Sequence, residues 1–259
     1  MPELPDLQVF SRNLSHALKG LKLIKVNVVQ SRKLNVPVKD LTKALEGEVL
    51  EDVIRSGKQL HFKFTNNQTL GVHLMLHGEI HWLEENTKQK FVIFELHFEG
   101  GKGIAVTDFQ RGVMPTLNPD PAEAPDALDK TVNTNFWKTK FKARRTAVKK
   151  ILMDQDVVRG IGNAYADEIL YDAGISPFSV ADKIPDDRVE ALAKSVKKVL
   201  VDAEKQILKS NPSIISGEVR DFLKVHRPKQ AATSDGAAIH MDTIASRKTY
   251  YTDKQQLFD

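Results

Sequence analysis

Hydrophobic residues recur at steps of three and four behind Pro5, close to the amino terminus. The positions are Leu7, Phe10, Leu14, Leu18 and Leu21. Steps of this size place side chains on one face of a helix, and proline suits the first helical turn. The pattern therefore predicts an amphipathic helix that ends near Gly20.

From about Leu23 to Val106 the hydrophobic spacing shortens to two. Apolar and polar residues alternate in the runs Leu60-Phe62-Phe64, Leu70-Val72-Leu74 and Val92-Phe94-Leu96-Phe98. Turn-forming pairs at 66–67 and 100–101 separate runs of this kind, so we expect antiparallel strands. Strands with one apolar face each pack as two layers, which predicts a β-sandwich flanked by the first helix.

A stretch at 116–131 is rich in proline and acidic residues and lacks periodicity, which is typical of a linker. Beyond it the helical spacing returns. The clearest apolar stripe there consists of Val189, Leu192, Val196 and Leu200. The chain thus has a strand-rich first part and a helical second part, which predicts an α+β fold.

Composition narrows the possible chemistry. The chain has 259 residues, which suits two domains, and no cysteine, which excludes disulfides, thiolate zinc sites and cysteine nucleophiles. No apolar run approaches the ~20 residues of a membrane span, and no secretory signal is visible, so we expect no membrane partner and an intracellular protein, cytoplasmic if bacterial. The net charge of +4 is consistent with a polyanionic partner.

The first residues carry candidate chemistry. Proline after Met1 lets processing expose Pro2 as a secondary amine, and an α-amino group is partly unprotonated at neutral pH. Such an amine can attack an aldehyde-like carbon, with Glu3 close enough to move protons. The alternative is a leader in which Pro5 only starts a helix.

A glycine turn at 160–162 precedes a second candidate site. Asn163 is expected to cap the helix that follows, which Gly174 ends. Backbone N–H groups at such a helix start bind anions, so a phosphate could sit beside Gly162 and Asn163. The alternative is an ordinary capped helix.

A basic run precedes this turn without an acidic residue. It consists of Lys138, Lys140, Lys142, Arg144, Arg145, Lys149 and Lys150. Charge runs are usually solvated helix faces, but this one could also follow a phosphate backbone.

Three stretches together resemble the formamidopyrimidine-DNA glycosylase and endonuclease VIII family. Residues 1–5 resemble its amino terminus, 160–168 its helix-two-turn-helix motif, and 246–251 the arginine-bearing hairpin of its carboxy-terminal finger. The resemblance covers the whole chain. The domains that it implies are a catalytic β-sandwich at 1–115, a linker at 116–131, a helix-two-turn-helix domain at 132–222 and a finger hairpin at 223–259.

The resemblance implies a DNA repair glycosylase with abasic-site lyase activity, acting on damaged DNA without a cofactor or a metal. Pro2 would attack C1′ of the sugar and Glu3 would shuttle protons. Lys58, Asn163 and Arg247 would bind phosphates around the lesion. A monomer is the simpler assumption.

The family places a wedge residue where this chain has Leu76, which would fill the space left by a flipped base. The alternative is that Leu76 belongs to the core, because it alternates with Leu74. Lys58 likewise has the alternative of a solvated lysine at a strand end.

Several family positions differ in this sequence. Gln110 and Gly112 replace an arginine and a phenylalanine around Arg111, a candidate DNA-binding residue. Either Phe109 substitutes, or the opposite base is checked loosely, or the substrates are already unpaired. Asp6 stands where glutamate is more common, which leaves base excision less certain than lyase chemistry.

The finger also departs from the family. The positions of its four zinc cysteines hold Ala232, Asp235, Thr252 and Gln255, none of which is a soft ligand. We therefore expect a zincless finger, held by strand pairing and packing of Ile239, Ile244, Tyr250 and Tyr251. Family members specialised for oxidised purines carry a longer loop than the segment at 211–229, so the resemblance implies an oxidised pyrimidine as the excised base.

Two rival functions remain. The first is a protein of the same fold that binds damaged or abasic DNA without excising a base. The second is an amino-terminal-proline tautomerase of small keto acids, which ranks far behind because it explains neither the basic run nor the turn before Asn163.

Overall fold

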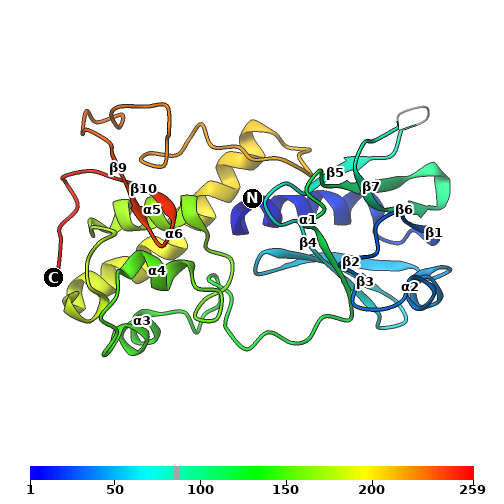
Figure 1. The fold of residues 1–259 in the computed structure, drawn as a ribbon, viewed down its shortest axis with the longest axis horizontal. Coiled ribbons are helices and arrows are strands. Elements are labelled where there is room, and N and C mark those ends of the chain that lie inside the picture. Colours follow the sequence, from blue (N-terminus) through cyan, green and yellow to red (C-terminus); the bar gives the residue numbers. More distant parts are fainter. Residues whose placement is uncertain (85–87) are drawn as a thin grey trace. The chain divides into compact units, whose positions relative to one another are not determined.

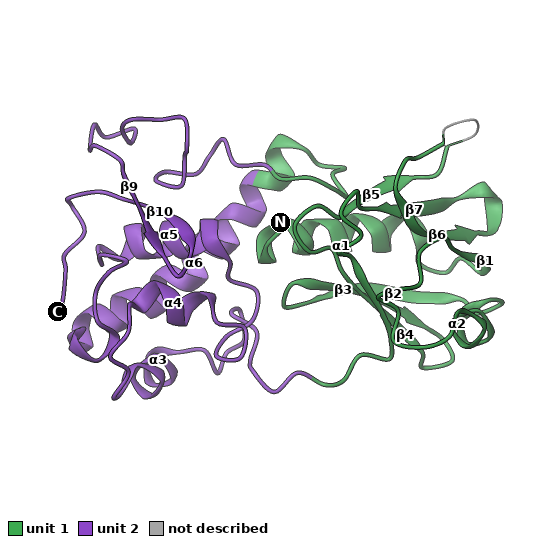
Figure 2. Cartoon of the chain, in the orientation of Figure 1, with its two compact units in different colours: residues 1–121, 207–218 green, residues 122–206, 219–259 purple. Residues whose placement is uncertain are grey.

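The computed structural model describes residues 1–84 and 88–259, and its contacts divide the chain into two compact units (Figure 2). Unit 1 consists of residues 1–121 and 207–218, and unit 2 of residues 122–206 and 219–259. Both units are discontinuous in sequence, whereas the domains expected from the sequence are continuous ranges. Those ranges therefore stay a prediction.

Unit 1 contains two four-stranded antiparallel sheets, which form separate layers (Figure 1). One sheet has the order β1-β6-β7-β5, with strands Leu23–Val28, Val92–Phe98, Gly103–Thr107 and Glu79–Trp82. The other has the order β2-β3-β4-β8, with strands Leu50–Ser56, Gln59–Phe64, Thr69–His73 and Met114–Leu117. The predicted β-sandwich is confirmed. Strand β8 pairs with β4 and takes up the first two residues of the expected linker.

Two helices complete the core of unit 1. Helix α1, Leu4–Leu18, packs on β2, and its residues Leu7, Phe10, Leu14 and Leu18 are buried as their spacing predicts. Helix α2, Val38–Leu45, adds Leu41 and Leu45 to the same cluster. A short 3-10 turn, η1, at Glu99–Gly101 joins β6 to β7. The apolar faces of both sheets and of α1 thus form one hydrophobic core, which holds the amino terminus in place.

Unit 2 is helical and carries a β-hairpin. Its elements are α3 (Thr134–Phe141), α4 (Val148–Met153), α5 (Asn163–Ala173), η2 (Ala181–Lys183), most of α6 (Asp186–Ser210), β9 (His240–Ile244) and β10 (Arg247–Tyr251). Helix α5 ends at Gly174, whose φ of 67° lies in the left-handed region that favours glycine. The predicted helical domain and carboxy-terminal hairpin are confirmed.

The end of α6 and the loop after it, residues 207–218, pack on the sandwich rather than on the helices of unit 2. Asn13 of α1 donates its Nδ2 hydrogen to the Ile214 carbonyl at 2.8 Å, and the Ser216 hydroxyl accepts from the Ile80 N–H at 2.9 Å. Ile215 is buried in the hydrophobic core of unit 1. This loop is therefore part of the wall around the amino terminus.

Among the described residues, the structure contains no helix that is both long and apolar enough to cross a membrane.

Candidate active site

The first turn of α1 fixes the position of the amino terminus. Glu3 is the N-cap of the helix and forms a capping box with Asp6, in which the Glu3 side chain accepts from the Asp6 N–H. The Asp6 carboxylate in turn accepts from the Glu3 N–H at 2.8 Å. Both side chains are buried. Aspartate is long enough for this reciprocal contact, which satisfies two N–H groups at the helix start.

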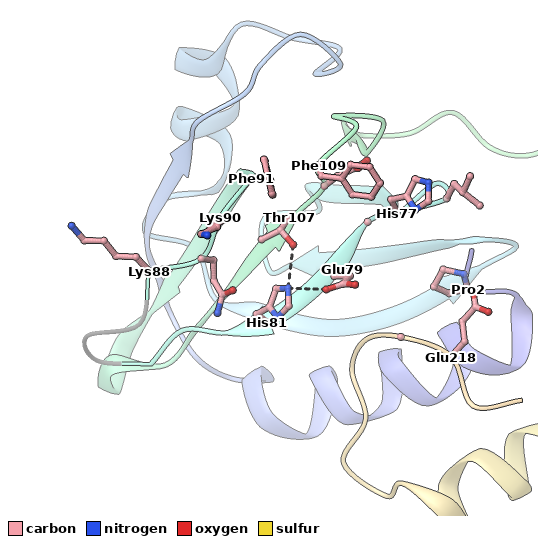
Figure 3. Close-up of a pocket in the computed structure, with 15 residues that line it drawn as sticks. Pro2, His77, Glu79, His81, Lys88, Lys90, Phe91, Thr107, Phe109 and Glu218 are labelled. Carbon is pink, nitrogen blue, oxygen red and sulfur yellow. Dashed lines mark hydrogen bonds and ion pairs between the residues drawn. The ribbon is translucent and has the colours of Figure 1, made fainter. Parts of the chain in front are cut away.

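Pro2 lines a cavity of about 640 Å³ in unit 1. The cavity is bounded by Pro2, Leu76, His77, Gly78, Glu79, His81, 88–91, 107–109, Gly217 and Glu218. In Figure 3, Pro2 and Glu218 are neighbours on one side of this cavity and Lys88 lies on the other. A free amine on Pro2 would therefore open into a space able to hold a small substrate group.

Leu76 is not a core residue. Its side chain is 56% exposed on the rim of the cavity, whereas Leu74 is buried. The alternation breaks because Met75 has a φ of 56° and the turn closes at Gly78, where a Cβ would lie 2.2 Å from the Leu74 carbonyl oxygen. This tight turn carries Leu76 outward and excludes the alternative that it packs inside.

Asp108 organises the loop that carries Phe109 and Arg111. Its buried carboxylate accepts from the N–H groups of Gln110, Gly112 and Val113 at 2.7–3.0 Å. Phe109 is consequently 57% exposed, and its ring lies 4.5 Å from that of His77, centroid to centroid. Arg111 is exposed, with a φ of 56°. The His77–Phe109 pair is a feature of the cavity rim that the sequence did not predict.

Lys58 occupies the two-residue turn between β2 and β3, where Gly57 has a φ of 58°. It is not among the described residues that line the Pro2 cavity. Burial, and then the charge of Lys58, hold the pKa of His73 below its usual value. His73 Nδ1 also accepts from the Met75 N–H at 3.0 Å, so Lys58 acts electrostatically on the residue that supports the Leu76 turn.

In unit 2, Gly162 rather than Asn163 is the N-cap of α5, so the prediction that Asn163 caps this helix is wrong. Asn163 is the first helical residue, and its Nδ2 group donates to the Lys248 carbonyl in β10 at 2.9 Å. The Asn163 side chain therefore does not cap α5 but joins the start of this helix to the hairpin.

Arg247 is the first residue of β10 and is exposed. The two residues before it, Ala245 and Ser246, have φ values of 49° and 60°, as the type I′ turn of a two-residue hairpin requires. Because Asn163 binds the carbonyl of Lys248, unit 2 places the start of α5 beside the Arg247 turn. The structure thus brings Gly162, Asn163 and Arg247 into one region.

The basic run is not a continuous charged surface. Lys149 is fully buried and pairs with Asp167 of α5 at 2.7 Å, so for this residue both the solvated-face and the phosphate interpretations are wrong. Helix α5 has acidic residues at 167, 168 and 172 and no basic residue. This composition is a sequence signal that a basic residue outside α5 pairs with one of these carboxylates. The exposed members of the run include Lys142, Arg144, Arg145 and Lys150.

Two side chains at the zinc-cysteine positions of the finger, Asp235 and Gln255, form hydrogen bonds with their neighbours. Lys254 and then Thr233 donate to Asp235 and hold the pKa of this carboxyl well below its usual range. Gln255 accepts from the Thr252 N–H at 2.9 Å and donates to the Ile175 carbonyl at 2.9 Å. No group of three or more metal-binding side chains occurs in the described part of the chain.

Comparison with known proteins gives matches to two family models. Residues 1–113 match the formamidopyrimidine-DNA glycosylase N-terminal domain, and residues 124–211 match the H2TH domain of the same enzyme. Formamidopyrimidine-DNA glycosylase from Magnetococcus marinus is 32% identical over 269 residues, covering 97% of this chain and 98% of that protein. The enzyme from Carboxydothermus hydrogenoformans is 32% identical, covering 77% and 76%.

Solved structures share the fold over nearly the whole chain. The Lactococcus lactis enzyme in complex with abasic-site DNA superposes with a TM-score of 0.88 at 22% identity, covering 98% of this chain and 99% of that one. A related structure with DNA containing carbocyclic 8-oxo-G has a TM-score of 0.88 at 24% identity. Together with the sequence matches, these similarities show that the chain belongs to the formamidopyrimidine-DNA glycosylase family of base excision repair, a family of bifunctional glycosylases and abasic-site lyases.

Proposed function

We propose that this protein excises an oxidised base from damaged DNA through a Schiff base on Pro2 and then nicks the strand. The observation that carries this proposal is the position of Pro2 in a cavity of about 640 Å³ whose rim exposes Leu76 and Phe109. A base inside the duplex is out of reach, so a base rotated into the cavity would meet the amine at its sugar carbon.

The proposed steps involve the DNA, this chain's residues and, for release of the sugar fragment from Pro2, water. The Pro2 nitrogen forms a bond to C1′, while the electrons of the C1′–base bond leave with the base. The sugar ring then opens as the C1′–O4′ bond breaks and O4′ takes up the proton that the bonded nitrogen loses. The iminium formed in this way acidifies the adjacent C2′ hydrogen. Loss of that proton eliminates the 3′ phosphate, and a second elimination releases the 5′ phosphate. Glu3 is close enough in sequence to move protons, although its carboxylate also caps α1.

DNA would be bound through its phosphates. Lys58 in unit 1 and Arg247 and Asn163 in unit 2 are the proposed phosphate contacts, with the Gly162 N–H region at the start of α5. Leu76 would fill the space of the flipped base. Phe109, exposed beside it on the cavity rim, supports the alternative in which this ring substitutes for the altered positions around Arg111.

The excised base is the least constrained part of the proposal. We infer a slight preference for oxidised pyrimidines, because the segment at 211–229 is shorter than the loop of family members specialised for oxidised purines. The Lactococcus lactis enzyme has been solved in complex with DNA containing an oxidised pyrimidine and, as a mutant, with Fapy-dG DNA. A DNA repair role also implies an intracellular protein.

The test is sodium borohydride trapping on a duplex with one abasic site. We expect a covalent adduct with the processed protein and none with Pro2→Gly, while both bind a non-reactive abasic analogue. Binding without any adduct from the wild-type protein would instead support the non-excising binder. A panel of duplexes with oxidised pyrimidines or purines then identifies the excised base.

A further inference from the structure

The loop at 211–218 brings a carboxylate to the amino terminus. The loop is attached to the sandwich by hydrogen bonds from Asn13 to Ile214 and from Ile80 to Ser216. The buried side chain of Ile215 and the partly buried side chain of Ile214 pack on the core. The next residues, Gly217 and Glu218, line the Pro2 cavity. The position of Glu218 is therefore set by the core of the sandwich and not by a free loop.

Glu218 contacts the end of the chain directly. Its Oε1 atom accepts a hydrogen bond from the amino group of Met1 and forms an ion pair with it. Figure 3 shows the Glu218 side chain next to Pro2. When Met1 is removed, the positive charge moves by one residue to the Pro2 nitrogen and remains beside this carboxylate.

The Glu3 carboxylate, next in sequence to Pro2, is held differently. Glu3 is 4% exposed and its side chain takes part in the capping box of α1, whereas Glu218 is about a third exposed on the cavity wall. Proton transfer from Glu3 would compete with its capping hydrogen bond. Glu218 can exchange a proton without disturbing a helix start.

We propose that Glu218 binds the amino terminus of the processed chain and handles its proton during the attack, an inference that rests on the proposed function. The Pro2 ammonium gives one proton to Glu218, and the freed lone pair forms the bond to C1′. The base leaves with the electrons of the C1′–base bond and takes the proton from Glu218. The restored carboxylate then faces the cationic nitrogen of the intermediate and stabilises it.

The inference predicts a specific dependence on pH. A carboxylate favours the protonated form of a nearby amine, so removing its charge lets Pro2 lose its proton at a lower pH. Among the described residues, the first turn of α1 and the cavity wall hold further charged or titratable groups. These are Glu3, Asp6, His77, Glu79, His81, Lys88, Lys90 and Asp108. All of them are unchanged in a Glu218 variant, so a shift in pH dependence reports on Glu218.

The experiment uses the full processed chain, with loss of Met1 checked by mass spectrometry for every variant. Single-turnover trapping with sodium cyanoborohydride on an abasic-site duplex is measured from pH 5.5 to 9 for wild type, Glu218→Gln and Glu218→Asp. Glu51→Gln, an exposed glutamate on β2, is the matched control. Binding to a duplex with a non-reactive abasic analogue is measured in parallel.

For Glu218→Gln we expect the plateau rate at high pH to fall by ~10-fold, because the cationic nitrogen of the intermediate loses the carboxylate that faces it. This is less than the usual ~10²–10⁴-fold of general acid–base catalysis, since Glu3 remains. The midpoint of the pH profile should move to lower pH, and binding should stay within about threefold of wild type. Glu218→Asp keeps the charge and should keep the midpoint.

A Glu218→Gln profile identical to that of Glu51→Gln would overturn this inference and leave the proposed function intact. Equal losses of trapping and binding would also overturn it, because they would indicate a structural role. Absence of an adduct with the wild-type protein at every pH would overturn the proposed function itself.

Discussion

Lys149 Nζ lies 2.7 Å from Asp167 Oδ1, and neither side chain is exposed to solvent. The second oxygen of Asp167 accepts from the Tyr250 N–H at 3.0 Å and is 2.7 Å from His226 Nδ1. Lys149 also donates to the Thr249 hydroxyl at 2.8 Å. One buried ion pair therefore joins α4 and α5 to the hairpin that carries Arg247, without a metal.

Lys149→Met should destabilise the protein by about 3–5 kcal/mol, because it removes the cation that faces the buried Oδ1 of Asp167. Urea unfolding measures the change. Lys150→Met, at the exposed neighbour, is the control and should stay within about 0.5 kcal/mol of wild type. The double variant Lys149→Met, Asp167→Leu should be more stable than Lys149→Met alone. A Lys149→Met protein as stable as the control would contradict the role of this pair.

Lys58→Ala should raise the pKa of His73, since the Lys58 charge adds to burial in lowering it. A histidine with a lowered folded pKa takes up protons more readily when unfolded, so stability falls as pH drops below the unfolded value of about 6.5. The variant should lose less stability in this window. NMR titration of His73 measures the pKa directly, with Lys63→Ala, at an exposed lysine of β3, as control.

The same titration tests whether Lys58 binds phosphate. A phosphate beside Lys58 offsets its positive charge, so bound abasic-site DNA should move the pKa of His73 upward in the wild-type protein. The shift should be smaller in Lys58→Ala. An identical shift in both proteins would show that the phosphate acts on His73 independently of Lys58.

Leu76→Ala should slow base excision from a fully paired lesion duplex by about tenfold or more, because nothing then fills the gap left in the base stack. Excision from a single strand should change little, since no stack has to be opened. Single-turnover excision on both substrates gives the comparison. Met114→Ala, at another exposed apolar residue of unit 1, is the matched control. Equal slowing on both substrates would argue against a wedge.

Arg247→Ala should weaken binding to all DNA sequences and reduce the slope of log affinity against log salt by about one, as expected for one lost phosphate contact. Fluorescence anisotropy at several salt concentrations measures the slope. Arg32→Ala removes an exposed charge of unit 1 and should leave the slope unchanged. The same slope in wild type and Arg247→Ala would place this arginine away from phosphate.

The fold was largely predictable because its signals are local. The spacing of Leu7, Phe10, Leu14 and Leu18 depends only on helical geometry, and the alternating runs depend only on the pleat of a strand. The tight turn at Gly78 explains why the alternation failed at Leu76, where a left-handed Met75 intervenes.

The parts of the site that the sequence left undetermined depend on contacts between distant residues. Residue type made Asn163 a good helix cap, but its amide binds the Lys248 carbonyl, 85 positions away. Lys149 looked like one charge among seven until the structure placed Asp167 against it. No sequence pattern near Glu218 indicated its role. Glu218 contacts Met1 because residues 207–218 pack on the sandwich of unit 1.

The attachment of residues 207–218 to the sandwich limits how the protein can be dissected. A fragment that stops at Pro121 would lack Ile215 and the hydrogen-bond partners of Asn13 and Ile80, and would leave an apolar gap open to water. Such a fragment should aggregate when expressed alone. A soluble amino-terminal half would require residues 207–218 to be fused to it through a short linker, so that they can pack on the sandwich.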